Sequence, residues 1–123
     1  MVKLLMQESI LTSMTKQMKY KTRLTKAATR DMDLIFDYIS KELKSESSAY
    51  KTMDKIKEAI LNLEEFPFIF SLMDEKPWKE RGFRKAVAGN YLIIYGVDEY
   101  SWNVIVYKVI NSRMDVNSIL NDI

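Results

Sequence analysis

The last third of the chain alternates apolar and polar residues with a period of two, in three runs separated by short turns. The first run starts at Phe83 and ends at Gly89-Asn90, a dipeptide typical of a two-residue hairpin turn. The second run, residues 91–97, is apolar on both faces apart from its tyrosine hydroxyls, as a central strand requires. The third run covers residues 102–110. These runs predict a three-stranded antiparallel meander.

The middle of the chain predicts two amphipathic helices. Residues 26–43 repeat apolar side chains every three or four positions, and Thr25 stands before them as a candidate N-cap. A second run extends to residue 65 with the same spacing and stops before Pro67, because proline ends a helix. The short join between the runs predicts an antiparallel helical hairpin. A brief alternating run at residues 20–24 predicts one further strand.

Together these elements predict an α+β fold: an N-terminal strand, a two-helix antiparallel hairpin and a three-stranded antiparallel meander that forms one small curved sheet. At 123 residues the chain has room for one domain, which we expect over residues 18–123. Residues 1–17 form an N-terminal extension with a weaker amphipathic pattern. Two interpretations of this extension stay open: a start codon upstream of Met18, or a helix that covers a sheet edge or binds a partner.

The chain contains no histidine and no cysteine. Disulfides, thiolate catalysis, imidazole acid–base chemistry and zinc sites of the Cys type are therefore excluded. No Gly-rich phosphate loop or metal-ligand spacing is present, so we expect neither a metal nor a cofactor. Any chemistry has to come from Arg, Lys, Tyr or carboxylates.

No apolar run approaches the roughly 20 residues that a membrane span needs, and the N-terminus lacks the pattern of a secretory signal. We therefore expect no membrane partner. A reduced intracellular setting fits the absence of cysteine, and we expect a cytoplasmic protein.

The net charge of +2 hides an uneven distribution of charged residues. Residues 1–30 carry seven Lys/Arg against one Glu, and residues 76–113 carry seven Lys/Arg against three acidic residues. Residues 31–65 carry nine acidic residues against five Lys. A basic sheet beside an acidic helical layer attracts a polyanion or an acidic protein on one face. The alternative is a solvated surface of mixed charge.

The cations of the last third are candidates for holding a phosphate or a carboxylate, because guanidinium binds planar anions bidentately and ammonium acts as a point charge. We expect them to converge on one concave side of the sheet, with the Arg-x-Asp motif after the last strand as the most informative member. The alternative for each cation is a loop cap, an ion pair or simple solvation. The candidates are Arg81, Arg84, Lys85, Lys108 and Arg113.

Six other polar residues need an interpretation. Tyr91, Tyr95 and Tyr107 suit stacking on bases or donation to a phosphate, although their period-two spacing favours a place in the core. Asp31, Asp33 and Asp37 stand near the N-terminus of the first predicted helix, where interaction with the helix dipole is a sufficient explanation without a metal site.

The order of four sequence segments resembles the RelE/ParE superfamily of toxins from bacterial type II toxin–antitoxin modules, also described as plasmid stabilisation proteins. The resemblance spans roughly residues 18–120. The segments that carry it are Ala27 to Ile39, Phe66-Pro67, Asn90 to Tyr95 and Val109 to Asp115.

This resemblance implies a growth-inhibiting toxin that a cognate antitoxin neutralises, and an antitoxin complex through which operator DNA is contacted. ParE-like members inhibit DNA gyrase. RelE-like members are ribosome-dependent endonucleases that cleave mRNA in the A site. A binding module without toxicity is a third reading of the same residues.

If the protein is an enzyme, the resemblance implies a metal-independent mRNA endoribonuclease, in which cations stabilise the charge that develops when a ribose 2′-hydroxyl attacks the adjacent phosphate. Lys85 matches a basic strand position of the RelE-like pattern, and Arg113 matches the basic position after the last strand. The catalytic candidates are therefore Lys85, Arg113 and Arg84. The candidates for binding a substrate or target are Arg81, Tyr91 and Lys108.

Three positions depart from the RelE-like pattern. Leu92 and Phe83 stand where that pattern has basic residues, and Ile119 stands where it has a C-terminal tyrosine. With two usual catalytic partners missing and a long helical hairpin, we favour a ParE-like or otherwise divergent toxin. Its target is either DNA gyrase or ribosome-bound mRNA, and the ribosome-dependent mRNA endonuclease is the alternative function.

Overall fold

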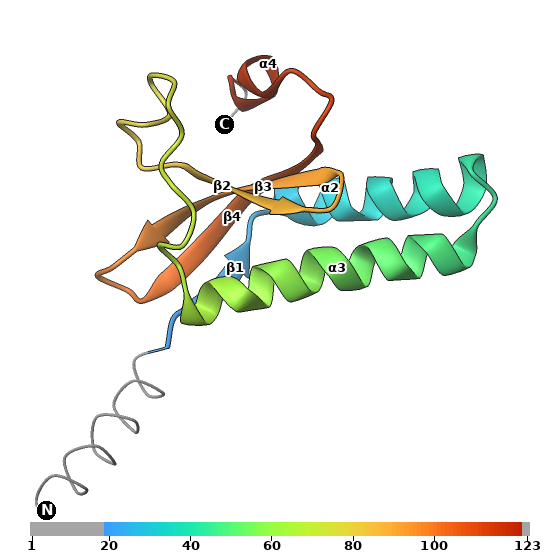
Figure 1. Ribbon diagram of the computed structural model, residues 1–123, viewed down its shortest axis with the longest axis horizontal. Helices are drawn as coiled ribbons and strands as arrows, with labels where there is room; N and C mark the ends of the chain where they lie inside the picture. The colour runs from blue at the N-terminus through green and yellow to red at the C-terminus, as the bar shows by residue number, and fades with distance from the viewer. Residues whose placement is uncertain (1–18, 122–123) are drawn as a thin grey trace, which may run out of the picture.

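The computed structural model describes residues 19–121, and its sheet contains four strands (Figure 1). In space they follow the order β1-β4-β3-β2, with β1 parallel to β4 and the other neighbours antiparallel. The predicted meander and N-terminal strand are confirmed, and each boundary lies within one residue of its prediction. The strands are β1 (Lys21–Leu24), β2 (Arg84–Ala88), β3 (Tyr91–Asp98) and β4 (Asn103–Asn111).

Two turns join the meander. Gly89, in the tight β2–β3 turn, has a φ of 59°, which glycine adopts without a steric cost. In the β3–β4 turn, the Asp98 carboxylate accepts hydrogen bonds from the Ser101 hydroxyl and from the amides of Ser101 and Tyr100, and these bonds lower the pKa of Asp98. Trp102 completes this turn at a φ of 58°, so β4 begins one residue later than predicted.

The predicted helical hairpin is confirmed (Figure 1). Helix α2 (Lys26–Asp37) starts where the Thr25 hydroxyl accepts a hydrogen bond from the Ala28 amide at 3.1 Å. The helix predicted to residue 43 changes to π-helical geometry for its last turn, η1 (Tyr38–Glu42). Helix α3 (Glu46–Glu65) then returns antiparallel beneath the sheet.

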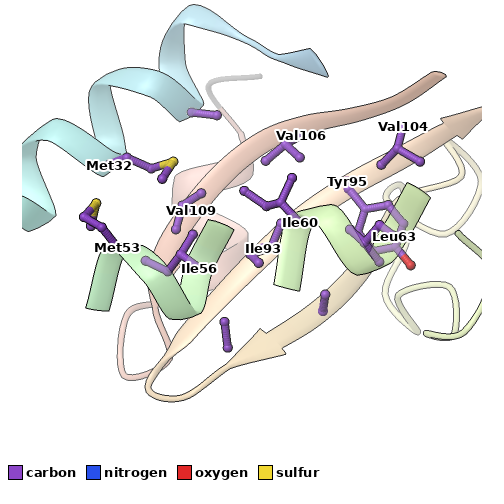
Figure 2. Packing of buried hydrophobic residues seen from close by; sticks show 13 residues of the cluster. Met32, Met53, Ile56, Ile60, Leu63, Ile93, Tyr95, Val104, Val106 and Val109 are labelled. Carbon is purple, nitrogen blue, oxygen red and sulfur yellow. The ribbon is translucent and has the colours of Figure 1, made fainter. Parts of the chain in front are cut away.

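Both helices bury their apolar stripes on one face of the sheet (Figure 2). Ile56 and Leu63 of α3 and Tyr95 of β3 are almost completely buried there. Each such side chain contributes about 1.5–3 kcal/mol, so this layer fixes the hairpin against the sheet. The predicted core position of Tyr95 is confirmed, whereas Tyr91 and Tyr107 are only partly buried.

The opposite face of the sheet is covered by the loop between α3 and β2 and by a short helix, α4 (Val116–Leu120), which the sequence did not predict. Trp78 from the loop donates a hydrogen bond to Asn117 of α4 at 3.0 Å. The seven buried residues of this layer are Met73, Trp78, Phe83, Leu92, Ile94, Ile110 and Leu120.

Candidate functional site

The site begins at the part of β4 that β1 does not cover. β1 pairs only with Asn103–Val106 of β4, and the chain then turns into α2. Beyond this point, side chains instead of a neighbouring strand bind the backbone of β4. The Thr25 hydroxyl donates a hydrogen bond to the Tyr107 carbonyl at 3.0 Å. The Asp31 carboxylate accepts from the Val109 amide, also at 3.0 Å. This edge of β4 is thus closed by polar groups of α2 and of the residue before it.

Asp31 also pairs with one of the predicted cations. Its carboxylate lies 2.8 Å from the Lys108 ammonium, and the two side chains are only 15% and 18% exposed. Asp31 lies beyond the first turn of α2, so this ion pair and the amide of Val109 explain the residue better than the helix dipole does. The charge of Lys108 is consequently compensated inside the protein.

A groove of about 660 Å³ opens next to this ion pair, between α2, the end of β4 and the segment leading into α4. Its lining is mainly apolar, and Leu34 and Met114 are more than half exposed. The polar lining includes Tyr91 and Arg113 as well as Lys108. The other lining residues are Asp31, Ile35, Tyr38, Val109, Ile110, Asn111 and Ile119.

Arg113 is the cation of this groove that remains available. It is exposed and forms no ion pair with any residue of the described range 19–121. The aspartate of the Arg-x-Asp motif does not neutralise it, because Asp115 caps α4 by accepting from the Asn117 amide and the Ser118 hydroxyl. The motif therefore combines a helix cap with a guanidinium that no acidic side chain of residues 19–121 neutralises.

Tyr91 contributes a neutral hydroxyl to the groove. Partial burial, and secondarily the nearby Tyr38, raise the pKa of Tyr91 above its ordinary value. At neutral pH the Tyr91 phenol is therefore protonated and can donate a hydrogen bond. The groove offers a ligand an apolar lining, the hydroxyls of Tyr91 and Tyr38, and the Arg113 guanidinium, which has no ion-pair partner within residues 19–121.

The other predicted cations lie elsewhere. The Arg84 guanidinium donates to the Phe70 carbonyl and stands 5.1 Å over the ring of Phe68. Lys85 is exposed, and the alternation of strand side chains directs it to the face opposite Arg84. Arg81 lies over the rings of Trp78 and Phe83, at 5.6 and 5.0 Å from their centroids.

The expected convergence of cations is therefore only partial. The groove brings together Tyr91, Lys108 and Arg113, and leaves out the three basic residues near the start of β2. Arg84 pairs with Tyr95 at one end of the β2–β3 hairpin, while Tyr91 is at the other end. Four residues of strand separate these ends by about 13 Å. The functional roles predicted for these residues stay predictions.

Sequence reasoning missed two exposed residues of the groove, Leu34 of α2 and Tyr38 of η1. Leu34 and Tyr38 lie one helical turn apart and are both more than half exposed, although each is large and apolar or aromatic. Their four-residue spacing, out of phase with the core stripe, was the available signal. Within residues 19–121 no three acidic side chains are placed to share a metal ion, and none of the helices there is long and apolar enough to span a membrane.

Comparisons with known proteins identify the fold. A family model described as the ParE toxin of the type II toxin–antitoxin system parDE matches residues 22–116. A structure of the chromosomal ParDE toxin–antitoxin system from P. aeruginosa aligns with a TM-score of 0.62 and 16% identity, over 76% of this chain and 97% of that one. No curated protein sequence matches the chain.

The second structure is the toxin–antitoxin complex RelBE2 from Mycobacterium tuberculosis. It aligns with a TM-score of 0.55 and 18% identity, over 76% of this chain and 98% of that one. At these identities the two likenesses show that the chain shares the fold of these proteins.

Proposed function

Because the chain belongs to the ParE toxin family of type II toxin–antitoxin systems, we propose that it stops growth by binding DNA gyrase and that a cognate antitoxin neutralises it. On this proposal the protein acts in the cytoplasm by protein–protein contact, without a cofactor. It meets operator DNA only through the antitoxin complex.

The observation that carries the choice of a protein target is the separation of the basic residues. An endonuclease needs several groups in contact with one developing phosphate charge, within hydrogen-bonding distance of it. Here Arg84 and Lys85 face opposite sides of β2, and Arg113 follows the strand end about 13 Å away along the hairpin. Inhibition by binding requires no such convergence.

The tyrosines support the same choice. Burial raises the pKa of Tyr20, Tyr91 and Tyr95, so each of them stays protonated at neutral pH. A general base works best when its pKa is close to the operating pH. The pKa values of these three tyrosines are shifted away from that range.

The groove beside β4 fits the antitoxin. It is lined mainly by apolar side chains, several of them exposed, and Arg113 adds a free positive charge at its rim. A disordered acidic segment that folds on binding would bury apolar side chains there and place a carboxylate on Arg113. We therefore assign the antitoxin to this groove.

The mRNA endonuclease remains the second candidate because one feature favours it: Tyr91, Lys108 and Arg113 line the same groove. In that case Arg113 would stabilise the developing phosphate charge and the Tyr91 phenol would donate a proton. Lys108 would have to act while paired with Asp31.

One pair of assays separates the two functions. Purified protein is added to a gyrase supercoiling reaction and to a ribosome-programmed translation reaction, as wild type and as Arg113→Ala. We expect loss of supercoiling with both proteins and no new mRNA ends. Codon-phased mRNA ends that disappear with Arg113→Ala would contradict gyrase inhibition and support the mRNA endonuclease.

Induced expression without the antitoxin tests toxicity itself. Growth arrest is expected. Normal growth at a verified expression level would leave only a non-toxic binding module.

A further inference from the structure

The loop after α3, residues Phe66 to Phe70, is anchored to the sheet by two neighbouring side chains. The Tyr95 hydroxyl donates to the Pro67 carbonyl at 2.8 Å, and the Arg84 guanidinium donates to the Phe70 carbonyl at 2.6 Å. Arg84 and Tyr95 are directly opposite each other in the β2–β3 register. Tyr95 is completely buried, at the edge of the cluster beside Leu63 (Figure 2). The loop backbone is therefore held from inside.

What this anchored loop presents to solvent is apolar. Phe66 is 58% exposed and Ile69 is 67% exposed, and Phe68 is nearly half exposed. Large apolar side chains on a fixed loop are a common mark of a protein-binding surface. A hollow of about 310 Å³ lies between this loop, α3 and β2. It is lined by Ala59, Asn62, Leu63, Phe66, Ile69, Phe70 and Val87.

The strand that borders the hollow has an open edge. β2 is the last strand of the sheet, and within residues 19–121 its outer side is bridged only at Arg84, opposite Leu72. The Phe83 carbonyl accepts from the Met73 amide on that side. Since backbone groups of a strand alternate in direction, the bridge at Arg84 engages the Phe83 carbonyl and the Lys85 amide, whereas the Lys85 carbonyl and both backbone groups of Val87 point outward without a bridge within residues 19–121.

We propose that the Phe66–Phe70 loop and the outer edge of β2 form a docking surface for an extended segment of the target protein, in which apolar side chains alternate with acidic ones. This inference rests on the proposed function, because it takes the target to be gyrase. Its occupant adds one strand beside Val87, through the outward amide and carbonyl of Val87 and the outward carbonyl of Lys85.

Apolar and acidic side chains are expected to alternate in the docked segment because the two faces of the added strand meet different surroundings. Side chains on the α3 side of the sheet enter the hollow beside Leu63 and Phe66, which is apolar. Side chains on the other side lie next to Lys85, which is exposed and forms no ion pair with a described residue. A carboxylate there gains a charge partner.

The test measures binding of purified DNA gyrase to immobilised toxin. Ile69→Asp places a charge in the apolar surface. Val87→Pro removes an outward amide without removing a hydrogen bond to β3, and proline is tolerated on such an edge. We expect each variant to weaken gyrase binding about tenfold or more, with an unchanged melting temperature. The matched control is Leu61→Asp, because Leu61 of α3 is 57% exposed and does not line the hollow.

The outcomes distinguish this inference from the proposed function. If wild-type protein does not bind gyrase, the proposed function fails and the docking surface for it fails too. If wild type binds and both variants bind equally well, the inference alone is overturned. It is also overturned if the variants keep gyrase affinity but lose self-association or antitoxin binding, since a second copy or the antitoxin would then be the occupant.

Discussion

The two outer sides of the sheet differ in how their backbone groups are satisfied. Beyond β1, the edge of β4 is closed by Thr25 and Asp31, and the nearby Lys108 is held in an ion pair. The outer edge of β2 has no such cover past Arg84 within the described residues, and Lys85 there is exposed.

This difference separates two kinds of recognition. Beside β4 the backbone is already satisfied, so a partner in the groove is selected by side chains such as Leu34 and Arg113. Beside β2 the backbone is available, so a partner is selected first by its ability to form a strand and then by its pattern of side chains. Two partners can therefore use one small domain without sharing a surface.

The largest expected loss of stability comes from disrupting the closed edge of β4. Asp31→Ala leaves the Lys108 ammonium and the Val109 amide without their partner in a mostly buried place. We expect the free energy of unfolding to fall by about 3 kcal/mol, as measured by chemical denaturation.

Two companion variants control this prediction. Asp31→Asn keeps an oxygen for the Val109 amide and should cost less, and Asp31→Ala combined with Lys108→Met should recover part of the loss because no buried charge remains. A loss below about 0.5 kcal/mol for Asp31→Ala would mean that the edge is not closed by this pair.

The second largest loss of stability is expected from releasing the loop Phe66–Phe70 on the side of β2. Tyr95→Phe removes the hydrogen bond that anchors the Pro67 carbonyl, and should lower the free energy of unfolding by about 1–2 kcal/mol. Burial raises the pKa of Tyr95 above its unfolded value of about 10, although Arg84 acts in the opposite direction. The contribution of Tyr95 is therefore complete below about pH 10 and is lost as the pH rises through the folded pKa.

Denaturation of wild type and Tyr95→Phe across this pH range checks both statements. The difference in stability between them should shrink above about pH 10. A difference that stays constant to about pH 12 would show that folding does not raise the pKa of Tyr95.

The third effect concerns the groove. Arg113→Glu reverses its free positive charge and should weaken antitoxin binding about tenfold, while the free energy of unfolding stays within about 0.5 kcal/mol of wild type. Calorimetric titration with the cognate antitoxin measures this. Arg81→Glu is the control, because Arg81 lies outside the groove. Equal affinities for both variants would place the antitoxin elsewhere.

Most of the fold could be predicted because its signals are local. The period of two in the strands, the helical stripes, the Thr25 cap and the turn at Gly89 each act within a few residues. Helix α4 has five residues, and its place depends on contacts with Trp78 and on the burial of Leu120, both distant from any local pattern.

The site was harder to predict for the same reason. Asp31 and Lys108 are 77 positions apart in the sequence, and the residues next to either one do not predict the ion pair. Arg84 did carry a usable signal: it shares its strand face with Ala86 and Ala88, small residues that indicate a buried face. An arginine on such a face is better placed to hold a loop than to bind a ligand, which is what its contact with Phe70 shows.

The smallest expected effect compares two lysines directly. Lys108 is paired and mostly buried, so changing it affects stability, whereas Lys85 is exposed on the open edge. Lys85→Glu should leave unfolding unchanged and should slow gyrase association a few-fold at low salt, because a charge at the rim of an interface acts mainly on the association rate. The effect should disappear at high salt, where exposed charges are screened. A decrease that persists at high salt would indicate that Lys85 is buried by the partner, and the docking surface would then extend across the other face of β2.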